Sequence, residues 1–364
     1  HKRPTTMEPA DLLITQFRTY LKWNKCRLNV LAFLVLGLLE KQTVNFTSLA
    51  TTFPGRSQTL SCYRRIQRFF LEVVFDESIM ATLIASLFAP EGKWQLSMDR
   101  TNWMFGIFKI NILFLAINYK GMSIPILWTL LPKKGCSNTT ERVELLKRFR
   151  KIFPEQAIQR LLMDREFKGK QWLKYLVHGN WPFCIRVPNN TLVPNKHQNR
   201  LLPVTRIFSL STGETMAIRQ PRKVWGQMVY LAASKKGSDP MVVICNAEPW
   251  RAISDYLQRW QIETMFQAMK GRGFNLEDTH LKDRDKISKL LCTLALAFCW
   301  AYKTGEWINE TTPIKVKSHG RKAQSIFRAG LDYLARILNH IDTWLEELFG
   351  AVALLFETRW ERAS

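Results

Sequence analysis

The succession of strand and helix signals between residues 94 and 187 constrains the fold of this chain most. The expected strands cover residues 94–99, 111–118, 122–130, 160–163 and 183–187, and the expected helices cover 138–152 and 168–178. The strands are rich in β-branched and aromatic residues. The first helix begins at the capping sequence Asn138-Thr139-Thr140-Glu141. This order predicts an α/β domain.

Three antiparallel strands followed by helix, strand, helix and strand are the order of an RNase H-like core. The flanking regions read as helical, and residues 188–240 contain five prolines with short strand candidates at 204–209, 215–219 and 224–232. We therefore predict an RNase H-like catalytic core with a β-rich insertion, flanked by helical N-terminal and C-terminal regions. The predicted regions are 1–90 helical and DNA-binding, 91–187 first part of the core, 188–240 β-rich insertion, 241–284 second part of the core, and 285–364 helical.

The charge balance points to a polyanionic partner. Lys and Arg number 53 against 30 Asp and Glu, which gives a net charge of +23. A protein with such an excess of positive charge most often binds nucleic acid. The alternative is a generally basic protein or one attracted to acidic membranes. The seven cysteines are scattered without a C-x-x-C pair, which is typical of a reducing cytosol and not of a zinc site or disulfide framework. The sequence begins without the apolar segment of a signal peptide, and we expect a cytoplasmic protein outside the membrane.

A helix-turn-helix is predicted near the N-terminus. Asn45 and Thr47 offer a cap for a short helix through residue 51, Pro54-Gly55 makes a turn, and Thr59 or Ser61 caps a second helix to about residue 72. The second helix carries the candidate DNA contacts Arg64, Arg65 and Arg68. A solvated basic face on an ordinary bundle helix is the alternative.

The stretch from 255 to 273 places four functional groups on one helical face. Arg259, Glu263 and Lys270 follow Tyr256 by 3, 7 and 14 residues, offsets that return to nearly the same azimuth at about 100° per residue. A carboxylate can hold a divalent metal, and the other three groups can grip phosphates. The alternative is a solvated face with ion pairs between neighbouring turns.

A second stripe on the same helix is expected to pack inside the protein. Its members are Ile253, Leu257, Trp260 and Thr264, at the spacing of a buried face. We therefore predict one continuous helix that starts near Pro249 and buries Trp260.

Three acids are candidate metal ligands and catalytic residues. Asp99 lies at the end of the first core strand, Asp164 at the end of the fourth, and Glu263 on the following helix. In an RNase H-like sheet those two strands are neighbours, so the carboxylates can converge. Three carboxylates without a histidine suit two Mg²⁺ or Mn²⁺ ions, which can drive phosphodiester chemistry. Taken singly, Asp99 can pair with Arg100, Asp164 can cap the next helix, and Glu263 can pair with Arg259.

The pattern Y-x2-R-x3-E-x6-K is matched by Tyr256, Arg259, Glu263 and Lys270, with Asp99 and Asp164 upstream. In these residues the chain resembles bacterial cut-and-paste DDE transposases of the insertion-sequence-four type. The resemblance implies that Asp99, Asp164 and Glu263 hold two metal ions and that Tyr256, Arg259 and Lys270 hold phosphates near the transposon end. It also implies end cleavage through a hairpin, strand transfer by the 3′-hydroxyl, a homodimer on paired ends, and a nucleoid-associated protein in bacterial cytoplasm.

Two residues are candidates for holding a flipped base. Related enzymes carry a Trp at the start of the strand before the signature helix, where this chain has Met241. Trp225 can substitute, although a Trp on a β-ribbon is more often part of the core. Two alternatives to a transposase remain: a metal-dependent nuclease that does not join strands, and a DNA-binding protein without catalysis.

Overall fold

The structure is a computed structural model that describes residues 9–55, 57–88, 92–197, 199–238, 240–318, 320, 322–340 and 343–356. Residues group into two compact units, one with residues 1–89, 103–110 and 265–364 and one with residues 90–102 and 111–264. The boundary falls inside two strands and one helix, and each unit is described by itself.

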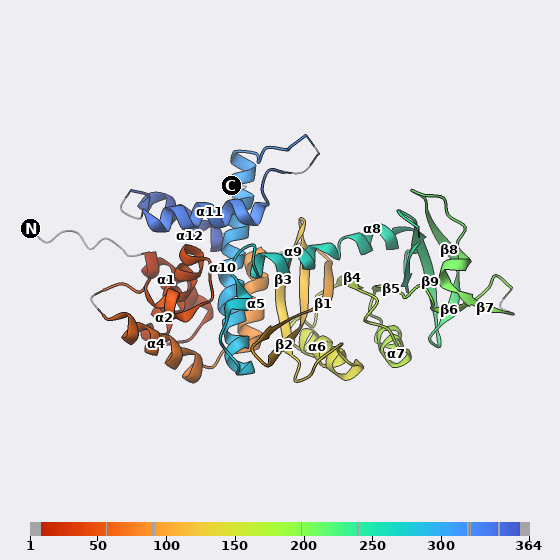
Figure 1. The fold of residues 1–364 in the computed structure, drawn as a ribbon, viewed down its shortest axis with the longest axis horizontal. Coiled ribbons are helices and arrows are strands. Elements are labelled where there is room, and N and C mark those ends of the chain that lie inside the picture. The colour runs from red at the N-terminus through yellow and green to blue at the C-terminus, as the bar shows by residue number, and fades with distance from the viewer. Residues whose placement is uncertain are drawn as a thin grey trace, which may run out of the picture. The chain divides into compact units, whose positions relative to one another are not determined.

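The unit that contains residues 111–264 is built on an eight-stranded sheet (Figure 1). Its strands are β1 (Trp94–Phe105), β2 (Phe108–Tyr119), β3 (Met122–Leu130), β4 (Ile158–Met163), β5 (Phe183–Arg186), β8 (Thr215–Val224), β9 (Gln227–Ser234) and β10 (Met241–Cys245). The strand order is β3-β2-β1-β4-β5-β10-β9-β8. β4 runs parallel to β1 and to β5, whereas β3 runs antiparallel to β2. The sheet confirms the predicted α/β, RNase H-like core, with β1 between β2 and β4.

The β-rich segment extends this sheet. β8 and β9 form an antiparallel hairpin, and β9 pairs antiparallel with β10, which in turn pairs with β5. Two short strands, β6 (Leu192–Pro194) and β7 (Leu201–Pro203), make a separate small sheet. The prediction of a strand at 204–209 is wrong, because Val204–Ile207 forms the 3₁₀ helix η1 immediately after Pro203.

Three helices pack around the sheet of this unit: α6 (Thr139–Ile152), α7 (Lys170–His178) and α8 (Ala252–Leu257). In Figure 1, α6 and α7 lie below the sheet and α8 lies above it. α6 begins where the sequence predicts, because Asn138 Oδ1 accepts from the Glu141 amide at 2.9 Å and Glu141 Oε2 accepts from the Asn138 amide at 2.7 Å. This reciprocal pair satisfies two amide groups that the first turn leaves open.

The other unit is a helical assembly around one long buried helix. It contains α1 (Pro9–Tyr20), α2 (Lys25–Lys41), α3 (Phe46–Ala50), α4 (Thr59–Glu72), α5 (Glu77–Phe88), α10 (Arg284–Thr311), α11 (Ile326–Asn339) and α12 (Leu345–Phe356). α10 is almost wholly buried from Ile287 to Glu306. α11 crosses it closely, since a Cβ at Gly330 would meet the Ala301 carbonyl oxygen and one at Gly305 would meet the Ile326 carbonyl oxygen.

The predicted helix-turn-helix segments are present in this unit. Asn45 Oδ1 accepts from the amides of Thr47 and Ser48 and so caps α3. α4 begins at Thr59, but Gln58 occupies the cap position and makes no side-chain cap bond, so the expected Thr59 or Ser61 cap is wrong. Within the described residues, no helix is long and apolar enough to cross a membrane.

Candidate active site

The register of β1 and β4 sets the position of the first two acids. The two strands are parallel, and Met98 of β1 lies opposite Met163 of β4. Asp99 and Asp164 therefore follow paired residues on neighbouring strands. Asp164 lies just past the end of β4 as predicted, but the prediction that the first core strand ends at Asp99 is wrong, because β1 continues to Phe105. Each carboxylate accepts a hydrogen bond from the next backbone amide, Arg100 N to Asp99 Oδ1 at 2.7 Å and Arg165 N to Asp164 Oδ1 at 2.6 Å. The same short sequence, Met-Asp-Arg, thus presents an acid from each strand.

The segment with the pattern Y-x2-R-x3-E is not one continuous helix. The 3₁₀ helix η2 (Pro249–Arg251) leads into α8, residues 258 and 259 form a turn, and α9 (Trp260–Met269) follows. The amides of Gln258 and Arg259 bond to the carbonyls three residues earlier, at 3.0 Å each. Bonds of this kind wind the chain tighter than an α-helix. The prediction of one helix from Pro249 onward is therefore wrong.

The change in winding alters which residues face inward. Tyr256 and Arg259 are buried, with relative exposures of 2% and 4%, whereas Trp260 is 57% exposed. Tyr256 packs with Leu162 and Val243 of the sheet in one buried cluster. The expectation that Trp260 packs inside is wrong, because the turn at 258–259 shifts its azimuth away from the sheet.

Arg259 and Tyr256 connect the three acids in one network. Arg259 donates from Nη1 to Asp99 Oδ2 at 2.7 Å and from Nη2 to Glu263 Oε1 at 2.6 Å. The Tyr256 hydroxyl donates to Asp164 Oδ1 at 3.4 Å. The structure therefore brings together five of the six residues of the predicted site.

Burial and charge set the protonation of this cluster. Burial raises the pKa of Asp99 to about 7, against the opposing effects of Arg259 and the Arg100 amide, and Glu166 and Asp164 raise it further. Burial also works against the charge on Arg259, but the Tyr256 phenol and Asp99 outweigh it and raise its pKa. Burial raises the pKa of Tyr256, so this phenol stays protonated as a donor. Arg259 offsets part of the negative charge of Asp99 and Glu263.

A second ion pair beside the acids was missed from the sequence. Arg100 donates from Nε and Nη2 to the two carboxylate oxygens of Glu166, at 3.4 and 3.2 Å, and from Nη1 to Asn111 Oδ1 at 2.9 Å. The Arg100 side chain therefore pairs with Glu166, and not with Asp99 as the sequence alternative proposed. The sequence hints at this pair only in that Arg100 directly follows Asp99 and Glu166 lies two residues after Asp164.

Lys270 lies in the helical unit. Its ammonium pairs with Glu277 Oε1 at 2.7 Å and lies 5.5 Å from the centroid of the Trp103 ring. Among the three arginines predicted on α4, Arg64 and Arg68 are exposed, whereas Arg65 is half-buried with its guanidinium 5.8 Å from the Phe53 ring centroid. Arg64 and Arg68 are thus the two that face solvent.

The two candidates for base capture occupy different settings. Met241 begins β10, is half-buried, and packs against the cluster that contains Tyr256. Trp225 is half-buried in the two-residue turn between β8 and β9, where Val224 pairs with Gln227. Trp225 has φ of 45° and Gly226 has φ of 87°, the left-handed pair that tight hairpins require. Trp225 is therefore a turn residue and not a strand residue.

Comparison with known proteins identifies the family. Residues 92–300 match the family described as "Transposase DDE domain", which is more than half of the chain and includes all three acids. The chain belongs to this family. A search of curated proteins finds no match.

Solved structures show two weaker likenesses to this DDE-family chain. A piggyBac transposase synaptic complex with hairpin DNA is similar over 98% of this chain and 86% of that chain, with 12% identity and a TM-score of 0.45. The catalytic domain of human endonuclease V is similar over 71% of this chain and 98% of that chain, with 11% identity and a TM-score of 0.27.

Membership of the DDE family implies the use of divalent metal, and the donor set fits it. Asp99 and Asp164 carry hard oxygen donors at matching positions of neighbouring strands, and carboxylate oxygens are the ligands that such ions prefer. Among the described residues, no three acidic, His or Cys side chains are already arranged around one ion position. Glu263 Oε1 accepts from Arg259, so this acid shares the guanidinium with Asp99.

Proposed function

We propose that this chain is a DNA transposase that binds transposon ends, cleaves them, and joins the 3′-hydroxyl ends to target DNA. The single observation that supports this most is the pairing of Met98 with Met163, which brings two acids from distant parts of the chain next to each other on neighbouring strands. The buried Arg259, bonded to both Asp99 and Glu263, adds the third acid. The match to the transposase DDE domain supports the same conclusion.

The proposed reaction has four steps on phosphodiesters: cleavage, hairpin closure, hairpin opening and strand transfer. A water attacks the phosphorus at the transposon end, the bond from phosphorus to the 3′ oxygen breaks, and that oxygen takes a proton to become a 3′-hydroxyl. This hydroxyl then attacks the opposite strand, where it displaces another 3′ oxygen and closes a hairpin. After water reopens the hairpin, the 3′-hydroxyl attacks a target phosphodiester in the same way.

Asp99, Asp164 and Glu263 are the proposed ligands of two Mg²⁺ or Mn²⁺ ions. Bound there, such ions activate the attacking oxygen and stabilise the leaving one. The protein itself fixes the two aspartates through the β1–β4 pairing and through the adjacent amides of Arg100 and Arg165. The acids therefore do not depend on a mobile loop for their position.

Arg259 and Tyr256 have two proposed roles. In the described conformation they hold the acids, since the guanidinium offsets Asp99 and Glu263 and the phenol donates to Asp164. With metal at the acids, Arg259 and Tyr256 are free to donate to phosphate oxygens of the transposon end, as a planar guanidinium does well. Lys270 is the third proposed phosphate contact.

Further DNA contacts are proposed outside the acid site. Arg64 and Arg68 are exposed on α4 and suit phosphates or guanine edges, and Arg65 is retained from the sequence prediction as a weaker candidate. Met241 and Trp225 are the proposed contacts of a flipped base. We also propose a homodimer on paired ends, located with the nucleoid in bacterial cytoplasm.

The test uses a donor plasmid that carries the DNA flanking the coding sequence on both sides, incubated with the protein and Mg²⁺. Joined products support the transposase, cuts without joining indicate a nuclease, and a gel shift alone indicates a binding protein. Asp99→Asn, Asp164→Asn and Glu263→Gln should each abolish cleavage and keep DNA binding. Glu144→Gln, an exposed acid on α6, is the matched control and should cut as the wild type does. Wild-type cutting by the three site variants would refute the assignment.

A further inference from the structure

A groove in the helical unit runs between α4 and the segment before α10. It has a volume of about 680 Å³ and is lined from both sides, by residues 44–47 and α4 on one and by residues 278–281 and Lys286 on the other. This volume lies in the range of pockets for small organic ligands. No predicted role of the catalytic site uses this groove.

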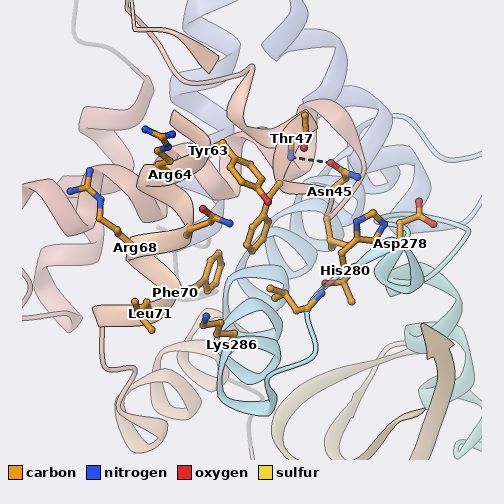
Figure 2. A pocket seen from close by; sticks show the side chains of 15 residues that line it. Asn45, Thr47, Tyr63, Arg64, Arg68, Phe70, Leu71, Asp278, His280 and Lys286 are labelled. Carbon is orange, nitrogen blue, oxygen red and sulfur yellow. Dashed lines mark hydrogen bonds between the residues drawn. The ribbon is translucent and has the colours of Figure 1, made fainter. Parts of the chain in front are cut away.

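The groove has a cationic end and a neutral-to-acidic end with aromatic rings between them. Figure 2 shows Arg64 and Arg68 on one side of the Tyr63 ring, with Asp278 and His280 on the other side. The Tyr63 ring lies between these ends and is half-buried. A phosphate is attracted to the arginine end and disfavoured next to Asp278, so the two ends of the groove differ in their affinity for an anion.

The aromatic residues of the groove are held in place by their neighbours. Phe70 stacks on Phe46, with ring centroids 5.0 Å apart and an angle of 9° between the planes. Phe70 itself is buried, and Lys286 lines the same groove from the side opposite α4, so a cation and the Tyr63 ring line one groove. Aromatic walls next to cations are the means by which proteins hold unpaired bases and their phosphates.

The groove continues past His280 into a second hollow. That hollow, of about 780 Å³, shares Asn45, Thr47, Asp278 and His280 with the first, and its further lining residues include Phe105 and the acid Glu277. The Phe105 ring stacks on His280, with centroids 4.9 Å apart and an angle of 17°. A strand of several nucleotides can therefore extend from the first hollow to a second aromatic surface, whereas a single nucleotide is too short to contact both.

We propose that this groove binds successive unpaired nucleotides of a DNA strand, with one base against Tyr63 and its phosphate near Arg64, Arg68 and Lys286. The proposal rests on the proposed function, because it presumes a DNA substrate. Asp278 accepts from an N–H group on the edge of the base, and the His280–Phe105 stack lies under the next base. The groove thus prefers single-stranded DNA, or the frayed end of a duplex, to a closed duplex.

The test measures binding in EDTA, so that cleavage cannot contribute. The probes are a fluorescent single strand of about 12 nucleotides, a closed duplex of the same length, and the competitors thymidine monophosphate and inorganic phosphate. Tyr63→Leu should weaken single-strand binding about tenfold, which is near the lower part of the stacking range, and should change duplex binding little. Tyr63→Phe keeps the aromatic ring and should bind the single strand as the wild type does. This result would show that the loss in Tyr63→Leu comes from stacking and not from misfolding.

Matched controls come from α1, which does not line the groove. Tyr20→Leu removes a half-buried phenol and Arg18→Gln removes an exposed charge, and both should bind the single strand as the wild type does. Arg68→Gln should lower the salt dependence of single-strand binding by about 0.7 in slope, since one phosphate contact is lost.

Three results would overturn the inference and leave the transposase proposal standing. These are unchanged single-strand binding by Tyr63→Leu, equal loss of duplex and single-strand binding in that variant, and competition by thymidine monophosphate or phosphate as strong as by the strand. Failure of the wild type to bind DNA of any form would instead refute the proposed function itself.

Discussion

Replacement of Arg259 by Gln tests how the acid cluster is held together. The side chains of Arg259 and Asp99 are 5% and 14% exposed, and their atoms are 2.7 Å apart. The substitution removes the charge that offsets Asp99 and Glu263 and leaves a nearly buried carboxylate without a cation. Removal of one partner from a buried pair typically costs about 3–5 kcal/mol. We expect a loss in that range for the unit that contains the sheet.

The double-mutant cycle with Asp99→Asn isolates the interaction. In the Asp99→Asn background the uncompensated charge is already gone, so Arg259→Gln should cost less there by about 1–3 kcal/mol. The free energy of unfolding is measured by urea titration in EDTA, followed by far-UV circular dichroism. Additive losses, within about 0.5 kcal/mol, would refute the claim that Arg259 stabilises the protein through Asp99.

A matched control and a metal titration complete this test. Arg251→Gln breaks a half-exposed pair with Glu248 at 3.9 Å in the same unit and should cost less than about 1 kcal/mol. Added Mg²⁺ should raise the melting temperature of Arg259→Gln more than that of the wild type, because a cation then offsets both acids. An equal or smaller rise in the variant would contradict that reasoning.

Three further perturbations test other parts of the structure. Lys270→Ala should weaken end binding and reduce its salt slope by about 1, measured by fluorescence anisotropy against Lys174→Ala as the control; an unchanged slope argues against a phosphate contact. Asp255→Asn should destabilise the sheet unit by about 3–5 kcal/mol in urea, since Asp255 pairs at 3.1 Å with Arg160, which is 2% exposed; a loss below about 1 kcal/mol contradicts this. Gly330→Ala should cost about 1–3 kcal/mol in thermal unfolding because its Cβ meets the Ala301 carbonyl, and wild-type melting would show that the two helices can separate at no cost.

Local signals in the sequence were sufficient for much of the core. The capping sequence at Asn138 starts α6 where predicted, because both bonds of the capping box lie within four residues. The run Met122–Leu130 forms β3 with the predicted bounds. The neighbouring positions of Asp99 and Asp164 also followed from strand order, since both acids directly follow paired residues.

The partners of the buried charges could not be read from the sequence. Arg259 donates to Asp99, 160 positions away, as well as to Glu263 in the next turn, and only the second pairing is visible from spacing. The turn at 258–259 contains no Gly or Pro that would predict it from the sequence, so the exposure of Trp260 was not predicted. Likewise, the pair of Arg100 with Glu166 depends on the proximity of β1 and β4 and not on any local pattern.

The most direct test of the central claim is a crystal structure of the full chain with Mn²⁺, in which anomalous scattering locates the metal. The account predicts Mn²⁺ about 2.1 Å from carboxylate oxygens of Asp99 and Asp164, with Glu263 released from Arg259 and turned to the metal. Mn²⁺ bound only at other acids, with Arg259 still joining Asp99 to Glu263, would contradict it.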